Sequence, residues 1–271
     1  MNSDDTTRTV GLASRRAGWG RELVASLPRS LRRTNDGMLP VDIMLVDGVP
    51  GWTIAAMQTL AQGVRALVVV EPGFVDPDEL AALADAVDEA GADLTLVDAL
   101  ADSAALAGFR NLLDDSFGEL VVDGARADCR SGLLLAQLRV LRALGLEGLQ
   151  LTMIDATCAS IIIEGEGHLG PATLRLRLSG AVGAGPERLA VIAHAAAATA
   201  RLSWRGGTAA RPIEVTLANV AGIRTLPAIH EGGHRRGLRA LLASTRAPSG
   251  SAALRAFGRD LDLLRVLLDA P

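Results

Sequence analysis

The most regular pattern in the chain lies between residues 41 and 97, where short apolar runs alternate with helical patterns. The apolar runs cover residues 41–46, 66–70 and 94–97. A helix is expected after Asp76-Pro77, because a capping aspartate, a proline in the first turn and nearby acids favour a helix start. Apolar strands that alternate with amphipathic helices predict a parallel sheet covered on both faces, and ligands of such sheets bind beyond the carboxyl ends of the strands.

The pattern changes after residue 149, where strand-like runs follow one another with glycine-rich turns between them. Residues 173–178 alternate between apolar and polar side chains, which is typical of an antiparallel sheet with one buried face. The glycines at 165, 167 and 170 match the letters G-x-G-x-x-G, but they precede Pro171 and this alternating run, so we expect a hairpin turn there. The sequence predicts an α/β fold: a truncated Rossmann-like parallel sheet domain over residues 1–122, then an α+β domain with a mainly antiparallel sheet over residues 123–271.

The N-terminal region resembles half of a dinucleotide-binding layout. A strand at residues 9–13 is followed by a glycine-containing turn and a helix at residues 21–27. No G-x-G-x-x-G is present, and Arg15 and Arg16 stand where small residues would let a pyrophosphate approach the backbone. We find no room for a second strand before residue 41, so we expect that strand to be deleted.

Composition restricts the chemistry more than the fold. All 27 basic residues are arginine, and the chain contains neither lysine nor tyrosine, which excludes mechanisms that use either side chain as a proton donor. A net charge of −4 gives no reason to expect nucleic acid as a partner. Two cysteines and the lack of a signal core or membrane-length apolar run lead us to expect a cytoplasmic protein.

Two acidic residues follow predicted strands and are the candidates for catalysis. Asp47 and Glu71 could each act as a general base or an orienting acceptor, or could be capping or solvated acids. Trp52 lies next to the same strand ends and could give a substrate site an apolar wall, or could be a core residue. The same alternatives apply to Trp19.

The turn Ser14-Arg15-Arg16 would bind a cofactor only if the ligand carries a phosphate, and otherwise its arginines are solvated. His230 to His234 reads H-E-G-G-H, the letters of a zinc motif that requires a helix. Two consecutive glycines oppose a helix, so we expect a glycine-rich loop before a helix at Arg235, and no metal site.

The order of these motifs resembles the Gfo/Idh/MocA oxidoreductases, the family of glucose–fructose oxidoreductase and inositol dehydrogenase. "VDIMLVDGVP" is similar to the family's strand and Thr-Pro turn, and "VVVEPGFVDPDELAALADAVDEAGADLTLV" to its strand, Glu-Lys-Pro motif and helix. "LLLAQLRVLRALG", "ATLRLRLSG" and "RLSWRGG" are similar to parts of its second domain. The resemblance implies a two-domain fold and NAD(P)-dependent hydride transfer.

The chain departs from the family at the residues that the resemblance associates with hydride transfer. Pro72 stands in the place of the Glu-Lys-Pro lysine, the helix at residues 131–144 holds Gln137 and no histidine, and the glycine fingerprint is broken. These departures suggest a degenerate member that keeps the fold but has lost the parent reaction.

Three functions are consistent with these departures. The first is a cofactor-independent cyclase, isomerase or lyase that acts on a small apolar metabolite in a biosynthetic pathway. The second is a noncatalytic subunit that pairs with an active homologue. The third is a residual NADP-dependent reductase. We expect a homo-oligomer formed through the C-terminal sheet, or a hetero-oligomer with a homologue, and no membrane partner.

Overall fold

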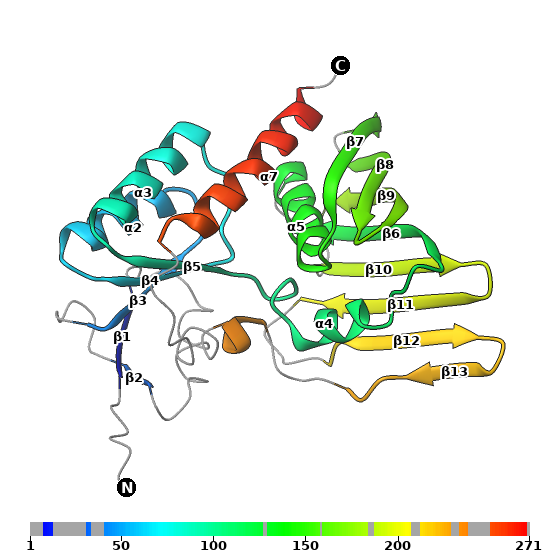
Figure 1. The fold of residues 1–271 in the computed structure, drawn as a ribbon. Coiled ribbons are helices and arrows are strands. Elements are labelled where there is room, and N and C mark those ends of the chain that lie inside the picture. Colours follow the sequence, from blue (N-terminus) through cyan, green and yellow to red (C-terminus); the bar gives the residue numbers. More distant parts are fainter. Residues whose placement is uncertain are drawn as a thin grey trace, which may run out of the picture. The chain divides into compact units, whose positions relative to one another are not determined.

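The computed structural model describes residues 8–12, 31–33, 41–126, 129–157, 159–183, 187–206, 212–228, 233–237 and 250–269 (Figure 1). The chain divides into two compact units. The first holds Met1–Ala99 and Gly233–Asp262, and the second holds Leu100–Gly232 and Leu263–Pro271. The predicted boundary at residue 122 differs from this division, since it would cut through a strand that lies inside the sheet of the second unit.

The first unit is built on a parallel sheet, as predicted. Its five strands are ordered β2-β1-β3-β4-β5, and every neighbouring pair is parallel. The strands are β1 (Arg8–Leu12), β2 (Leu31–Arg33), β3 (Ile43–Asp47), β4 (Ala66–Val70) and β5 (Asp93–Val97). Residues 67–70 of β4 are all buried, which is why the run at 66–70 is continuously apolar rather than alternating.

Strand β2 corrects the expectation that a second strand was deleted. Its three residues pair with β1 in parallel, with Leu31 opposite Arg8 and Arg33 opposite Val10. Three residues with two arginines carry no apolar run or alternation, so only the pairing with β1 identifies this segment as a strand. The sheet of the first unit therefore has a short outer strand beside β1.

Helices α2 (Trp52–Ala61) and α3 (Pro77–Glu89) follow β3 and β4 and contact each other (Figure 1). The predicted start of α3 is confirmed, because the Asp76 side chain accepts a hydrogen bond from the Asp78 N–H. The sequence predicts a closing helix over residues 252–268, and helix α7 (Ala252–Leu268) has these bounds. Its first turn is tied to the end of α3, where the Ser251 hydroxyl donates to Asp88 at 2.7 Å.

The second unit contains an eight-stranded sheet with the order β13-β12-β11-β10-β6-β9-β8-β7. Only the β6–β9 pair is parallel among these, so the sheet is mainly antiparallel, as predicted. The strands are β6 (Phe117–Arg126), β7 (Glu147–Ala156), β8 (Ser160–Leu169), β9 (Ala172–Val182), β10 (Arg188–Ala195), β11 (Ala198–Arg205), β12 (Glu214–Asn219) and β13 (Gly222–Thr225). The β8–β9 hairpin turns at Gly170, which has a φ of +58°, so the hairpin expected at this glycine motif is confirmed.

Helices α4 (Ala104–Arg110) and α5 (Arg130–Ala143) pack on one face of this sheet, α4 on β11 and β12 and α5 on β6 and β9. Gln137 of α5 is fully buried, and its amide nitrogen donates to the carbonyl oxygens of Val122 and Ser179 at 3.1 and 2.7 Å. This residue therefore joins the helix to the parallel pair of strands. None of the described helices is both long and apolar enough to cross a membrane.

Candidate functional site

The ends of β3 and β4 are joined by backbone contacts that leave no space between them. The Gly48 N–H donates to the Val70 carbonyl at 2.8 Å, and the Gly48 carbonyl accepts from the Gly73 N–H at 2.9 Å. A Cβ at position 48 would lie 2.0 Å from the Glu71 carbonyl oxygen, so only glycine fits there. These contacts hold the loop Glu71-Pro72-Gly73 in place at the carboxyl edge of the sheet.

Glu71 is fixed on both its backbone and its side chain. Its N–H donates to the Val97 carbonyl at 2.8 Å, and its φ of +52° places it in the left-handed region, where non-glycine residues are uncommon. Its Oε1 accepts from the Ala99 N–H at 2.8 Å and lies 2.7 Å from Nε2 of His234. The strained backbone and the two contacts together aim this carboxylate at the imidazole.

His234 lies in residues 233–237, which are helical. The Gly233 N–H donates to the Ala99 carbonyl at 2.9 Å, and a Cβ at 233 would lie 2.2 Å from the Asp98 carbonyl oxygen. A Cβ at Gly237 would come within 2.8 Å of the Val97 side chain. The two glycines thus let this segment lie directly against the end of β5, which brings His234 to Glu71.

This arrangement corrects the expectation for the H-E-G-G-H stretch. Gly233 and His234 are helical rather than part of a loop that ends before Arg235, because Gly233 is held by the end of β5. His230 and Glu231 lie outside the described residues. No three His, Cys, Asp or Glu side chains among the described residues are grouped to hold a metal ion.

A carboxylate paired with an imidazole is an acid–base unit. The carboxylate fixes the ring orientation and stabilises the imidazolium that forms when the ring takes up a proton. In this pair the side chains of His234 and Glu71 are 25% and 33% exposed, so both are partly desolvated and still accessible. The site can therefore take up or release a proton at the edge where ligands of parallel sheets bind.

The other predicted site residues fall into three groups. Asp47 is the last residue of β3 and is half-buried. It stands opposite Val70 of β4, the residue directly before Glu71. Trp52 is only 1% exposed, its indole N–H donates to the Gly73 carbonyl, and its ring meets that of Phe257 edge to face. Trp52 is therefore a core residue rather than the wall of a substrate site.

Ser14, Arg15, Arg16 and Trp19 lie outside the described residues. The structure instead brings in His234, which the sequence presented only as part of a zinc-like motif. Its partner Glu71 is 163 positions away. The signal that could have pointed to it is Gly233 directly before the histidine, since a glycine there allows a close approach to other backbone.

The fold is shared with solved dehydrogenases, although no protein-family model and no curated protein sequence matches the chain. A dehydrogenase from Chromobacterium violaceum is 12% identical with a TM-score of 0.69, and the match covers 96% of this chain and 95% of that one. UDP-N-acetylglucosamine 3-dehydrogenase GnnA from Acidithiobacillus ferrooxidans is 12% identical with a TM-score of 0.67, over 96% and 97% of the two chains.

A third similar structure is KijD10, a 3-ketoreductase from Actinomadura kijaniata solved with NADP. It is 11% identical with a TM-score of 0.69, over 96% of this chain and 97% of that one. At these identities the likeness concerns the fold alone, and it supports the Gfo/Idh/MocA resemblance at that level. The chain has the fold of these dehydrogenases and reductases across nearly its whole length.

Proposed function

We propose that the protein is an enzyme that transfers a proton to or from a small metabolite, with Glu71 and His234 as its acid–base pair. The observation that carries this proposal is the 2.7 Å contact between Glu71 Oε1 and His234 Nε2 at the carboxyl edge of the parallel sheet. His234 is the group that exchanges the proton, and Glu71 orients it. Asp47, at the end of the adjacent strand, is the second acidic group within this edge.

Cyclisation, isomerisation and elimination are the reaction classes that need such a pair and no redox cofactor. Each requires a proton to leave one atom and, in the first two, to be returned to another, which a histidine held by a carboxylate performs in both directions. Orientation of the metabolite at the sheet edge would supply the rest of the rate enhancement. This reading keeps the fold and replaces the reaction of the similar dehydrogenases.

The position of Pro72 supports this reading. In the Gfo/Idh/MocA family that this chain resembles, the same position holds the lysine associated with catalysis, and the side chain of a proline has no proton donor. Pro72 is buried between Glu71 and Gly73, whose backbones are locked to Gly48. The proton-transfer group of this site therefore has to come from elsewhere, and His234 is in place for it.

A second candidate function is an NADP-dependent reductase, which the presence of β2 favours. In dinucleotide-binding folds an acid after the second strand binds the ribose hydroxyl of NAD, and an arginine there accommodates the 2′-phosphate of NADP. Strand β2 ends in Arg32 and Arg33, and Asp36 follows three positions later in the sequence. An arginine and an acid thus both stand near the end of this strand, which fits NADP as well as NAD, while residues 13–20, which would contact the pyrophosphate, lie outside the described residues.

Bound NADPH would supply a hydride at this sheet edge, and His234 would then provide the proton that the missing lysine provides in the resemblance. Calorimetric titration with NADPH and NADH separates the two candidates. Saturable micromolar binding of NADPH, weakened by Arg33→Glu, would replace the cofactor-independent proposal with the reductase. Absence of binding at millimolar cofactor would remove hydride transfer.

The proton-transfer proposal itself is tested without knowing the substrate. A panel of small carbonyl and unsaturated metabolites is incubated with the protein in D₂O, and deuterium incorporation at carbon is followed by NMR. We expect exchange of one compound that is lost in His234→Asn and strongly reduced in Glu71→Gln. His168→Asn is the matched control, because His168 lies on strand β8 of the second unit beside Thr173. Exchange that persists in His234→Asn would refute the proposal.

A noncatalytic subunit is less well supported, because that hypothesis would be favoured by an apolar exposed face on the C-terminal sheet. On that face Arg175 and Arg177 of β9 stand opposite Glu166 and Glu164 of β8, and all four are exposed. Association through this sheet, as a homo-oligomer or with a homologue, would therefore be expected to depend on salt.

A further inference from the structure

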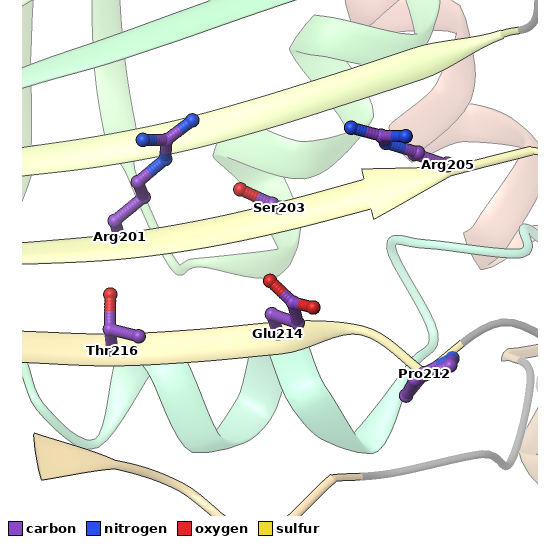
Figure 2. Close-up of a pocket in the computed structure, with 6 residues that line it drawn as sticks. All are labelled: Arg201, Ser203, Arg205, Pro212, Glu214 and Thr216. Atoms are coloured by element: carbon purple, nitrogen blue, oxygen red, sulfur yellow. The ribbon is translucent and has the colours of Figure 1, made fainter.

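The face of the eight-stranded sheet opposite α4 and α5 carries a pocket on β11 and β12. Ala200 and Leu202 of β11 point to the face covered by helices and are fully buried, while Arg201 and Arg205 are exposed on the opposite face. The pocket has a volume of about 520 Å³ (Figure 2). It is lined by Arg201, Ser203, Arg205, Pro212, Glu214 and Thr216. The described lining residues all belong to the second unit, and neither Glu71 nor His234 is among them.

Strand pairing places the lining groups in a fixed pattern. Ser203 stands opposite Glu214, and Arg201 opposite Thr216, on neighbouring antiparallel strands. Figure 2 shows the two guanidinium groups inclined toward each other above the Ser203 hydroxyl, with the Glu214 carboxylate on the β12 side. The pocket therefore has cationic groups at its two ends and hydroxyl groups and one carboxylate along its floor.

The charge at this corner of the sheet is unbalanced. Arg188 of β10 stands directly opposite Arg205, and like charges in that position destabilise a sheet. Three arginines thus share the corner with Glu214, the carboxylate among the described lining residues, while the nearby carboxylate of Glu187 lies beside Gly206 and pairs with Arg126. The chain as a whole has a net charge of −4, so this excess of positive charge is local.

Arginines elsewhere on the same face do not show this imbalance. Arg175 and Arg177 each stand opposite a glutamate of β8, Glu166 and Glu164. The exposed arginines of β9 therefore each stand opposite a carboxylate, whereas Arg201 stands opposite Thr216 and Arg205 opposite Arg188. A bound anion would give these two arginines a negatively charged partner.

We propose that this pocket binds the phosphate or diphosphate group of a small molecule. The forked guanidinium groups of Arg201 and Arg205 match phosphate oxygens and would bind them from two sides. The hydroxyl groups of Ser203 and Thr216 donate to the same oxygens. The Glu214 carboxylate can only accept hydrogen bonds, so it selects a ligand that carries a hydroxyl or another donor group beside its phosphate.

The test is calorimetric titration of the full chain with pyrophosphate and with inorganic phosphate at low ionic strength. We expect saturable 1:1 binding that weakens by about tenfold in Arg201→Gln and in Arg205→Gln, because each substitution removes one charge-assisted contact. Glu214→Gln removes a negative charge that repels pyrophosphate from the floor of the pocket, so this variant should bind pyrophosphate more tightly. All three positions are exposed, so these variants are expected to keep the fold.

Arg175→Gln is the matched control, since it removes an exposed arginine from the same face outside the pocket. Equal weakening by Arg175→Gln would show nonspecific attraction and overturn the proposal. Binding that survives both pocket variants but is lost in Arg15→Gln/Arg16→Gln would place the phosphate at the N-terminal turn and also overturn it. Failure of both anions to bind, together with a lower sedimentation coefficient of Arg201→Gln, would assign the pocket to a carboxylate of a second copy of this chain.

Discussion

Replacement of Glu71 by alanine and by glycine separates the two features that define this residue. Alanine removes the carboxylate but keeps a side chain in the left-handed backbone, whereas glycine removes the carboxylate and also relieves the backbone strain. The carboxylate makes two contacts, with the Ala99 N–H and with His234. At about 1 kcal/mol for each hydrogen bond of a partly exposed group, Glu71→Ala should lower the free energy of unfolding by about 2 kcal/mol.

Glu71→Gly should cost less than Glu71→Ala. The left-handed conformation costs a non-glycine residue about 1–2 kcal/mol, which glycine does not lose. The greater freedom of glycine in the unfolded chain offsets about 0.5–1 kcal/mol of this advantage. The glycine variant is therefore expected to be more stable than the alanine variant by about 0.5–1 kcal/mol. At almost any other half-buried position the order of the two variants is the reverse.

Urea unfolding of both variants measures this difference, and hydrogen exchange of the Ala99 amide reports the local loss of its acceptor in each. Glu89→Ala is the control, because Glu89 is an exposed residue at the end of α3 in the same unit. We expect that control to stay within about 0.5 kcal/mol of the unmodified chain. A glycine variant equal to or less stable than the alanine variant would refute the left-handed assignment, and unchanged exchange at Ala99 would refute its hydrogen bond to the carboxylate.

Three further substitutions test other contacts of the first unit. Gly48→Ala would place a Cβ 2.0 Å from the Glu71 carbonyl oxygen, a clash with backbone that should cost about 2–3 kcal/mol in urea unfolding. Trp52→Phe loses a hydrogen bond from the indole to a loop carbonyl and should cost about 1 kcal/mol, measured in the same way. The hydrogen bond from the Ser251 hydroxyl, above all, holds the pKa of Asp88 below its usual 3.8, so the stabilisation it reports is complete above that pH and is lost as the pH falls below it. Asp88→Asn should therefore lower the Tm more at pH 7 than at a pH below 3.8, and an equal loss at both values would contradict this account.

The strands and helices with strong local patterns were predictable from the sequence. Strand β4 and helix α7 have their predicted bounds because one is a continuous apolar run closed by a turn and the other a long amphipathic repeat. Strand β2 was missed because Leu31-Arg32-Arg33 is defined only by pairing with β1. Strand β13 was missed because it is an edge strand with all four residues exposed, so no apolar alternation marks it.

The candidate site was predictable only in part, because its geometry depends on contacts between distant segments. Position after a strand was enough to select Glu71 and Asp47, since the carboxyl ends of parallel strands meet at one edge. The same reasoning selected Trp52, whose large apolar ring was equally consistent with a substrate wall and with the core. Its contacts with Gly73 and Phe257 decide for the core, and neither partner could be inferred from spacing along the chain.

Pro72 has a structural consequence for the residue before it. Proline fixes its own φ and restricts the residue before it, and here that residue is Glu71, held at a φ of +52° with its carboxylate directed to Ala99 and His234. The carbonyl of Glu71 lies against Gly48, so the loop cannot relax into another conformation without breaking that contact. An imidazole both donates and accepts protons near neutral pH, whereas a lysine ammonium mainly donates. The proposed role of His234 therefore suits reactions in which one group removes a proton and later returns it.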